Sequence, residues 1–177
     1  MQIADRHLRQ ALVVIDEATA GMSADDLAWQ RAGAWSTGEI LEHLSRTYAS
    51  TAHIFRKCLR DDEPKGRRQT ARQRLFTFMV LRVGYFPSGI KSPALVEPQG
   101  LPPTEALHAA RRELVAFDQA ATACAERFGP RARVANHPLL GGFTTDQWRR
   151  FYWRHTRHHM RQITVLNEAR RLALQSR

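Results

Sequence analysis

The sequence predicts one all-α domain, a four-helix bundle with an additional helix inserted in its middle. Apolar residues recur at helical spacing in five stretches, start and stop signals flank these stretches, and no stretch keeps the alternation of a strand. With 177 residues, of which 43% are hydrophobic, the chain is long enough to bury one substantial core. We therefore expect a single domain over residues 1–177.

The first two predicted helices are separated by a connector. Helical spacing of apolar residues predicts a helix over Ile3–Thr19, which a glycine then stops. Residues 22–34 form the connector and contain one short turn at most. The second helix starts at Ser36, which fits a capping box with Glu39, an arrangement that satisfies free amides at a helix start. It ends before the charged turn at residues 61–66.

The inserted helix is basic at its start. Residues 67–85 resume helical spacing, and we expect them to pack against the bundle or a second subunit rather than a membrane. Residues 86–103 hold five prolines and two glycines, so they form a loop or lid and not a continuous helix. Helices over residues 104–128 and 144–174 complete the bundle, with a loop over residues 131–143 between them.

Composition limits the classes of function. A net charge of +10 raises the question of nucleic acid, but the arginines are spread through every segment and no nucleic-acid-binding motif is present. Cys58 and Cys124 fall on apolar helical faces, which indicates buried free thiols rather than a redox pair. No apolar run is long enough to span a membrane, and the charged first residues do not fit a signal peptide. We expect a cytoplasmic protein without a nucleic-acid partner.

Three histidines lie within five positions of the last predicted helix. At about 100° per residue, His155 and His159 fall near the centre of the inward stripe that contains Trp148 and Leu166, and His158 falls on its flank. Histidines at i and i+4 can share one metal ion. The alternative is a pair of core histidines without a metal, but their ring nitrogens would then need other buried partners.

A third ligand would have to come from another helix. His43 lies on the apolar side of the second helix, and with His155 and His159 it would leave a coordination position open. His7 is the rival, and we favour His43. His137 lies in the loop before the last helix, whereas His155 lies ~11 residues into it, about 16 Å along the axis, so ligation by His137 requires the loop to fold back.

These residues also carry a family resemblance. The motifs are Trp35-Ser36-Thr37-Gly38-Glu39-Ile40-Leu41-Glu42-His43-Leu44, then His137-Pro138, Gly141, Trp148 and His155-x-x-His158-His159-x-x-Gln162-Ile163. They resemble the DinB-like superfamily, in particular its DUF1569 branch. The resemblance implies an up-down-down-up four-helix bundle, frequently a homodimer, with nickel or zinc held by three histidines. The triad of the family falls on His43, His155 and His159.

The resemblance implies thiol-dependent S-transfer or isomerisation with a low-molecular-weight thiol, or else hydrolysis. We therefore predict a metal-dependent hydrolase or thiol S-transferase that acts on a small molecule. The alternative is a non-enzymatic, metal-binding or stress-related structural bundle. No catalytic residue is assigned. Glu42 or Asp146 is a candidate general base, but we interpret Glu42 as a solvent-facing carboxylate, and Arg154, Arg157 and Arg161 as a solvated face. Gln162 is expected either to orient a ligand or to cap a buried polar group.

Overall fold

The computed structural model describes residues 3–86 and 92–175, and this part of the chain is mostly helical, as predicted. Its helices are α1 (Arg6–Thr19), α2 (Ala24–Ala28), α3 (Thr37–Asp61), α4 (Ala71–Phe78), α5 (Pro103–Phe128) and α6 (Thr145–Gln175). A π-helical turn, η1 (Met79–Val83), continues α4, and a 3-10 turn, η2 (Ala94–Val96), precedes α5. The strands β1 (Arg133–His137) and β2 (Gly141–Thr144) form a hairpin.

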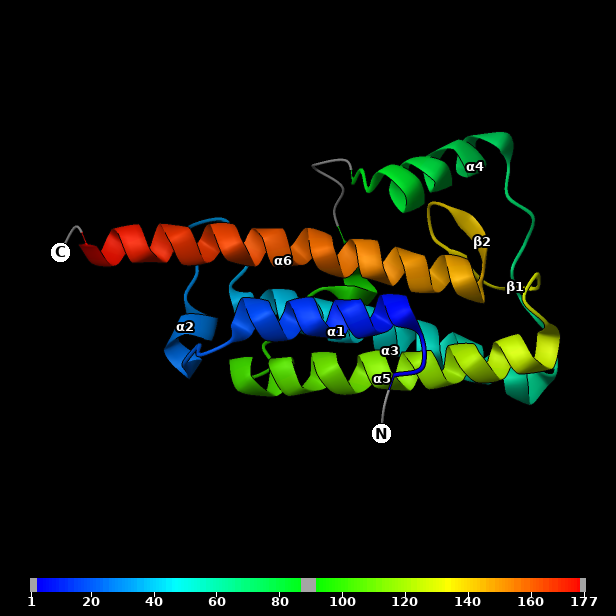
Figure 1. Ribbon diagram of the computed structural model, residues 1–177, viewed down its shortest axis with the longest axis horizontal. Helices are drawn as coiled ribbons and strands as arrows, with labels where there is room; N and C mark the ends of the chain where they lie inside the picture. The colour runs from blue at the N-terminus through cyan, green and yellow to red at the C-terminus, as the bar shows by residue number, and fades with distance from the viewer. Residues whose placement is uncertain (1–2, 87–91, 176–177) are drawn as a thin grey trace.

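The four long helices α1, α3, α5 and α6 lie side by side, and α4 stands apart from them above α6 (Figure 1). The most extensive contact joins α3 to α5, and α1 packs along α6. Aromatic rings fill the space between α3, α5 and α6: the Phe117 ring lies 5.5 Å from that of Phe55 and 4.7 Å from that of Tyr152. Each such fully buried side chain contributes roughly 1.5–3 kcal/mol to the stability of the fold.

Capping residues set the starts of α3 and α6 where the sequence predicted them. The Ser36 Oγ accepts from the Glu39 amide at 3.1 Å, and the Ser36 amide donates to the Glu39 carboxylate at 2.7 Å. The Thr144 amide donates to the Gln147 side chain at 3.0 Å, and the Gln147 amide donates back to the Thr144 hydroxyl. These local bonds fix the phase of both helices, and therefore which of their side chains face inward.

The inserted helix begins later than predicted. Thr70 and Gln73 form a capping box, so α4 starts at Ala71 and not at residue 67. The chain before it runs beside the hairpin instead, where the Lys65 amide donates to the Val134 carbonyl at 3.0 Å. The Arg67 amide donates to the Asn136 side chain at 2.8 Å, so the chain still follows the hairpin at the residue where the helix was predicted to begin. The helix starts only where Thr70 supplies a cap.

The hairpin was not predicted, because its strands of five and four residues are too short for a periodic signal. It occupies the loop between α5 and α6 and pairs His137 with Gly141. Gly142 is required there, because a Cβ at this position would lie 2.1 Å from the Arg67 carbonyl oxygen. The close approach holds the segment before α4 against the hairpin.

The described part of the proline-rich loop, residue 86 and residues 92–102, is irregular apart from η2, and residues 87–91 lie outside the described residues. Cys58 and Cys124 are buried free thiols, as predicted. Burial raises the pKa of Cys124 to about 12, so this thiol stays protonated.

Among the described helices, none combines the length and the apolar character needed to cross a bilayer.

Candidate metal centre

The structure brings together three of the predicted histidines, one from α3 and two from consecutive turns of α6. His43, His155 and His159, called the histidine group below, each offer one ring nitrogen, and these atoms lie within 4.8 Å of one another. The ring of His43 lies 5.4 Å from that of His155 and 4.9 Å from that of His159. In the described part of the chain, neither His7 nor His137 belongs to this group.

Two of the three rings are oriented by hydrogen bonds from the nitrogen that faces away from the group. The His43 Nδ1 lies 2.8 Å from the Val96 carbonyl oxygen, and the His159 Nδ1 lies 2.7 Å from the Gln162 Oε1. Both partners accept, so each Nδ1 carries the proton and each Nε2 keeps a free lone pair. A partner of this kind fixes the tautomer and the direction of a metal-binding histidine.

The third ring, that of His155, has a buried nitrogen without a hydrogen-bond partner in the described part of the chain. Its Nε2 lies 3.1 Å from the His159 Nε2, and its buried Nδ1 has no hydrogen-bond partner among the described residues. Two lone pairs at this distance repel each other unless a proton or a cation lies between them. Two ligands of a tetrahedral zinc ion, each at 2.0–2.1 Å, are roughly 3.3 Å apart. The three imidazoles are suitable ligands for a divalent metal ion, and the spacing of the His155 and His159 nitrogens matches that of two such ligands.

All three histidines are held in their neutral form. Burial lowers the pKa of His159 to about 3, and burial also lowers the pKa of His43. The pKa of His155 is lowered well below its usual value, first by burial and then by the neighbouring histidines. Neutral imidazole is the form that binds metal, so at pH 7 the histidine group needs no deprotonation before it binds.

Aromatic rings surround the group. The Phe151 ring stacks on His155 at 5.3 Å, the Phe86 ring lies 6.0 Å from the same histidine, and the Trp35 ring lies 5.2 Å from His43. Aromatic neighbours lower the local polarity, and a low local polarity strengthens interactions with a cation. Phe86 and Phe151 were not predicted to border the site, because no local pattern in the sequence places them beside the histidines.

Glu42 is buried, so its interpretation as a solvent-facing carboxylate is wrong. Its two oxygens accept hydrogen bonds from the backbone amides of Gln99, Gly100 and Leu101 at 2.8, 3.1 and 2.9 Å. His43, the next residue, bonds to Val96 in the same segment. Glu42 thus fixes the loop whose Val96 carbonyl orients His43. This contact depends on the path of the loop, so it could not be predicted from the sequence.

Replacing Glu42 by alanine is expected to lower the free energy of unfolding by about 3 kcal/mol, because three partly buried amides lose a charged acceptor. For a chain of this size the melting temperature should fall by roughly 6–12 °C in calorimetry. Glu17→Ala, which removes an exposed carboxylate from α1, is the matched control. Equal melting temperatures for the two variants would contradict this role of Glu42.

His137 lies near the start of α6 and stabilises the β1–β2 hairpin. Its Nδ1 accepts from the backbone amides of Leu139 and Leu140 at 3.2 and 3.3 Å, which closes the hairpin turn. Its ring packs 4.7 Å from that of Phe151. Burial lowers the pKa of His137 to about 4, and protonation at Nδ1 would break both bonds.

Acid should therefore destabilise the protein through His137. In the unfolded chain its pKa is near 6.5, so its contribution is fully present above pH 6.5 and is lost as the pH falls toward 4. Between pH 7 and pH 5 the loss from this residue should be on the order of 2 kcal/mol. His137→Asn keeps an acceptor and does not titrate, so urea unfolding of this variant should show a smaller loss over that range. An unchanged pH dependence would contradict the prediction.

Comparison with known proteins gives one match. The family model DUF1569, described as a protein of unknown function, matches residues 9–165. No curated protein and no solved structure matches the chain. The match does not by itself connect the chain to the DinB-like superfamily.

Proposed function

Because the chain belongs to the DUF1569 family, whose function is unknown, we propose a function from the site itself. The histidine group holds one divalent metal ion, and the protein is a metal-dependent enzyme that acts on a small molecule at the open coordination position. The observation that supports the proposal is the set of three ring nitrogens within 4.8 Å of one another, in a group where the Nδ1 atoms of His43 and His159 are bonded to other acceptors and their Nε2 atoms keep a lone pair.

The side chains around the group have separate tasks in this proposal. Val96 and Gln162 keep His43 and His159 in the tautomer that presents Nε2. The rings of Phe86 and Phe151 exclude water from the reacting groups. A metal in such a site polarises a carbonyl group, acidifies a water molecule or holds a thiolate. Hydrolysis and thiol-dependent S-transfer are the reactions that use these properties.

The resemblance to the DinB-like superfamily extends the proposal. It adds nickel or zinc as the metal, a low-molecular-weight thiol as a co-substrate, and a cytoplasmic homodimer of single-domain, up-down-down-up four-helix bundles. Four long helices packed side by side support the bundle (Figure 1). Imidazole ligands support zinc and nickel over magnesium or calcium, which prefer oxygen.

A structural metal is the second candidate function. The histidine group joins α3 to α6, two helices that are distant in the sequence, so an ion there would clamp the bundle. A clamp needs no turnover and predicts only a gain in stability. This observation keeps a non-enzymatic, stress-related bundle as the alternative.

Turnover distinguishes the two functions. The purified, metal-loaded protein is assayed against a panel of esters, amides and thiol-plus-electrophile pairs, with and without added thiol. An enzyme should turn over at least one member, and His159→Ala should abolish that turnover while an exposed-histidine variant, His53→Ala, retains it. Stoichiometric metal without turnover across the panel would favour the structural clamp.

A further inference from the structure

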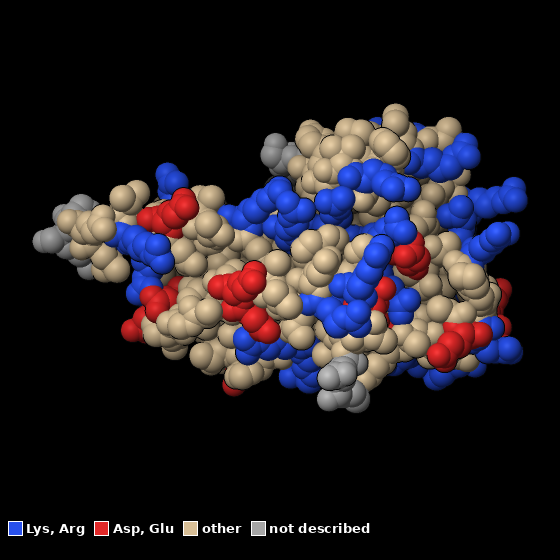
Figure 2. All heavy atoms as spheres, in the orientation of Figure 1, with Lys and Arg blue, Asp and Glu red and all other residues tan. Residues whose placement is uncertain are grey.

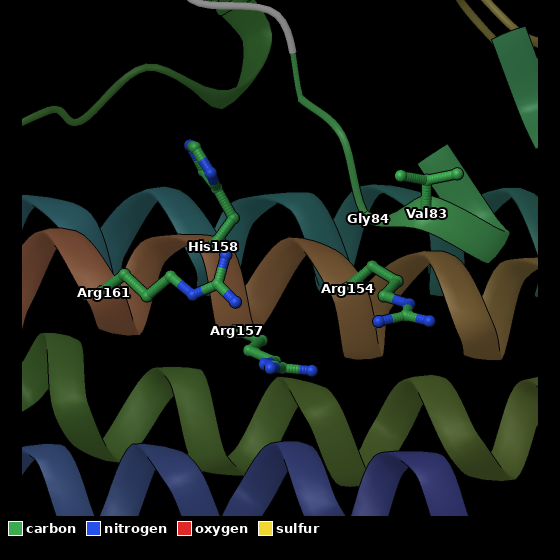
Figure 3. A pocket seen from close by; sticks show the side chains of 6 residues that line it. All are labelled: Val83, Gly84, Arg154, Arg157, His158 and Arg161. Carbon is green, nitrogen blue, oxygen red and sulfur yellow. The ribbon is translucent and has the colours of Figure 1, made fainter. Parts of the chain in front are cut away.

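One side of α6 carries positive charge next to the histidine group. Arg154, Arg157, His158 and Arg161 follow one another at helical spacing and, with Val83 and Gly84 of the inserted region, line a hollow of about 90 Å³. Figure 3 shows their side chains on successive turns of α6, beneath the chain at Val83 and Gly84. These six residues are called the arginine hollow below. A hollow of this volume can hold a small oxyanion.

The charge in the arginine hollow has no carboxylate partner in the described part of the chain. Arg154 donates to the backbone carbonyls of Leu81 and Arg82 at 3.3 and 3.0 Å, and neither Arg157 nor Arg161 forms an ion pair with a described residue. Unneutralised guanidinium groups on one face repel each other, which an anion would relieve.

Other arginines of the same helix are neutralised. Arg149 pairs with Asp118 at 3.3 Å, and Arg150 pairs with Asp146 at 2.9 Å. From Asp146 to Glu168, α6 contains no other acidic residue. In Figure 2, Lys and Arg atoms lie along the middle of α6 and, interspersed with uncharged atoms, in the region of α4. The hollow is therefore a local excess of charge rather than part of a mixed surface.

The arginine hollow and the histidine group share a wall. The His158 ring lies 5.3 Å from that of His159, and Gln162, which accepts from His159, places its amide nitrogen 3.4 Å from the His158 Nε2. The Phe86 ring lies 5.1 Å from His158 and 6.0 Å from His155. The arginine hollow therefore directly adjoins the histidine group, with His158 belonging to the hollow and contacting His159.

We infer that the arginine hollow binds an oxyanion, a carboxylate or phosphate group, of the small molecule whose other end occupies the metal. This inference rests on the proposed function and adds the substrate class, an anionic small molecule. Guanidinium groups bind both oxyanions through paired N–H donors, and their field raises the rate of capture. In this proposal Arg154, Arg157 and Arg161, which were predicted to form a solvated face, bind the anionic group of the substrate.

Two thiols that differ only in charge test the inference. The cobalt-loaded protein is titrated with 3-mercaptopropionate and with its neutral amide at low ionic strength, and binding is followed by the cobalt absorption. 3-Mercaptopropionate should bind at least about 10-fold more tightly than the neutral amide, because one charge-assisted hydrogen bond changes the affinity by about this factor. In the double variant Arg157→Gln, Arg161→Gln this preference should disappear. Arg150→Gln, which removes an arginine already paired with Asp146, should retain it.

The possible results of this titration distinguish failure of anion binding in the arginine hollow from failure of metal binding by the histidine group. Cobalt binding with equal affinity for the two thiols overturns the inference and leaves the metal site intact. If the protein binds no cobalt, the proposed function fails, and calorimetry with inorganic phosphate then tests the hollow alone. Saturable phosphate binding that the double variant loses supports the hollow, and absence of binding to the unmodified protein overturns it.

Discussion

The variant His159→Ala is expected to contain less than about 0.1 metal ion per chain where the unmodified protein contains about one. Removal of one of three ligands leaves two nitrogens, and the affinity should fall by at least about 100-fold, since even the loss of an orienting partner costs 10- to 100-fold. His43→Ala and His155→Ala should behave in the same way, because each supplies one of the three nitrogens. Elemental analysis after dialysis measures the effect.

A histidine outside the group supplies the control. His108 is exposed on α5, so His108→Ala should keep the metal content of the unmodified protein. Circular dichroism of each variant should show the same helix content, because the ligands lie at the ends of packed side chains rather than in the backbone ladder. Full metal content in His159→Ala would contradict the assignment of the histidine group.

Metal removal is expected to lower the melting temperature substantially. A ligand that binds only the folded protein stabilises it by about 4 kcal/mol when its free concentration is 1,000 times its dissociation constant. For a chain of this length each kcal/mol moves the melting temperature by roughly 2–4 °C, so a shift of roughly 8–16 °C is expected. The stabilisation arises because one ion ties α3 to α6. Calorimetry with and without a chelator measures it.

The same measurement on His159→Ala gives the control. Without a full ligand set, the melting temperature of this variant should not depend on added metal. A chelator that leaves the melting temperature of the unmodified protein unchanged would contradict metal binding at this site. The Cys58 and Cys124 thiols do not complicate the result, because both are buried and neither lies in the histidine group.

The sequence predicts those features that depend on local geometry. Ser36 with Glu39 and Thr144 with Gln147 set the starts of α3 and α6 through bonds over three residues, so a short pattern is sufficient to find them. Once the helix starts are fixed, the 3.6-residue period decides that His155 and His159 face the same way. His43, His155 and His159 lie next to one another because these side chains face inward on α3 and α6 and the two helices pack together.

Features that depend on the path of a loop were not predicted. Glu42 is satisfied by three amides of a loop more than fifty residues away, and no local pattern announces such a partner. The β1–β2 hairpin is stabilised partly by backbone hydrogen bonds to the chain before α4. Its two strands are too short to be identified from the sequence alone. The arginine hollow likewise forms only where Val83 and Gly84 approach α6.

Anomalous X-ray diffraction from crystals of the metal-loaded protein, collected at the absorption edge of the metal, would locate the ion itself. We expect one strong peak that lies about 2.0–2.1 Å from a ring nitrogen of each of His43, His155 and His159. A peak elsewhere in a stoichiometrically loaded protein, or three imidazoles turned away from the peak, would rule out metal binding by the histidine group.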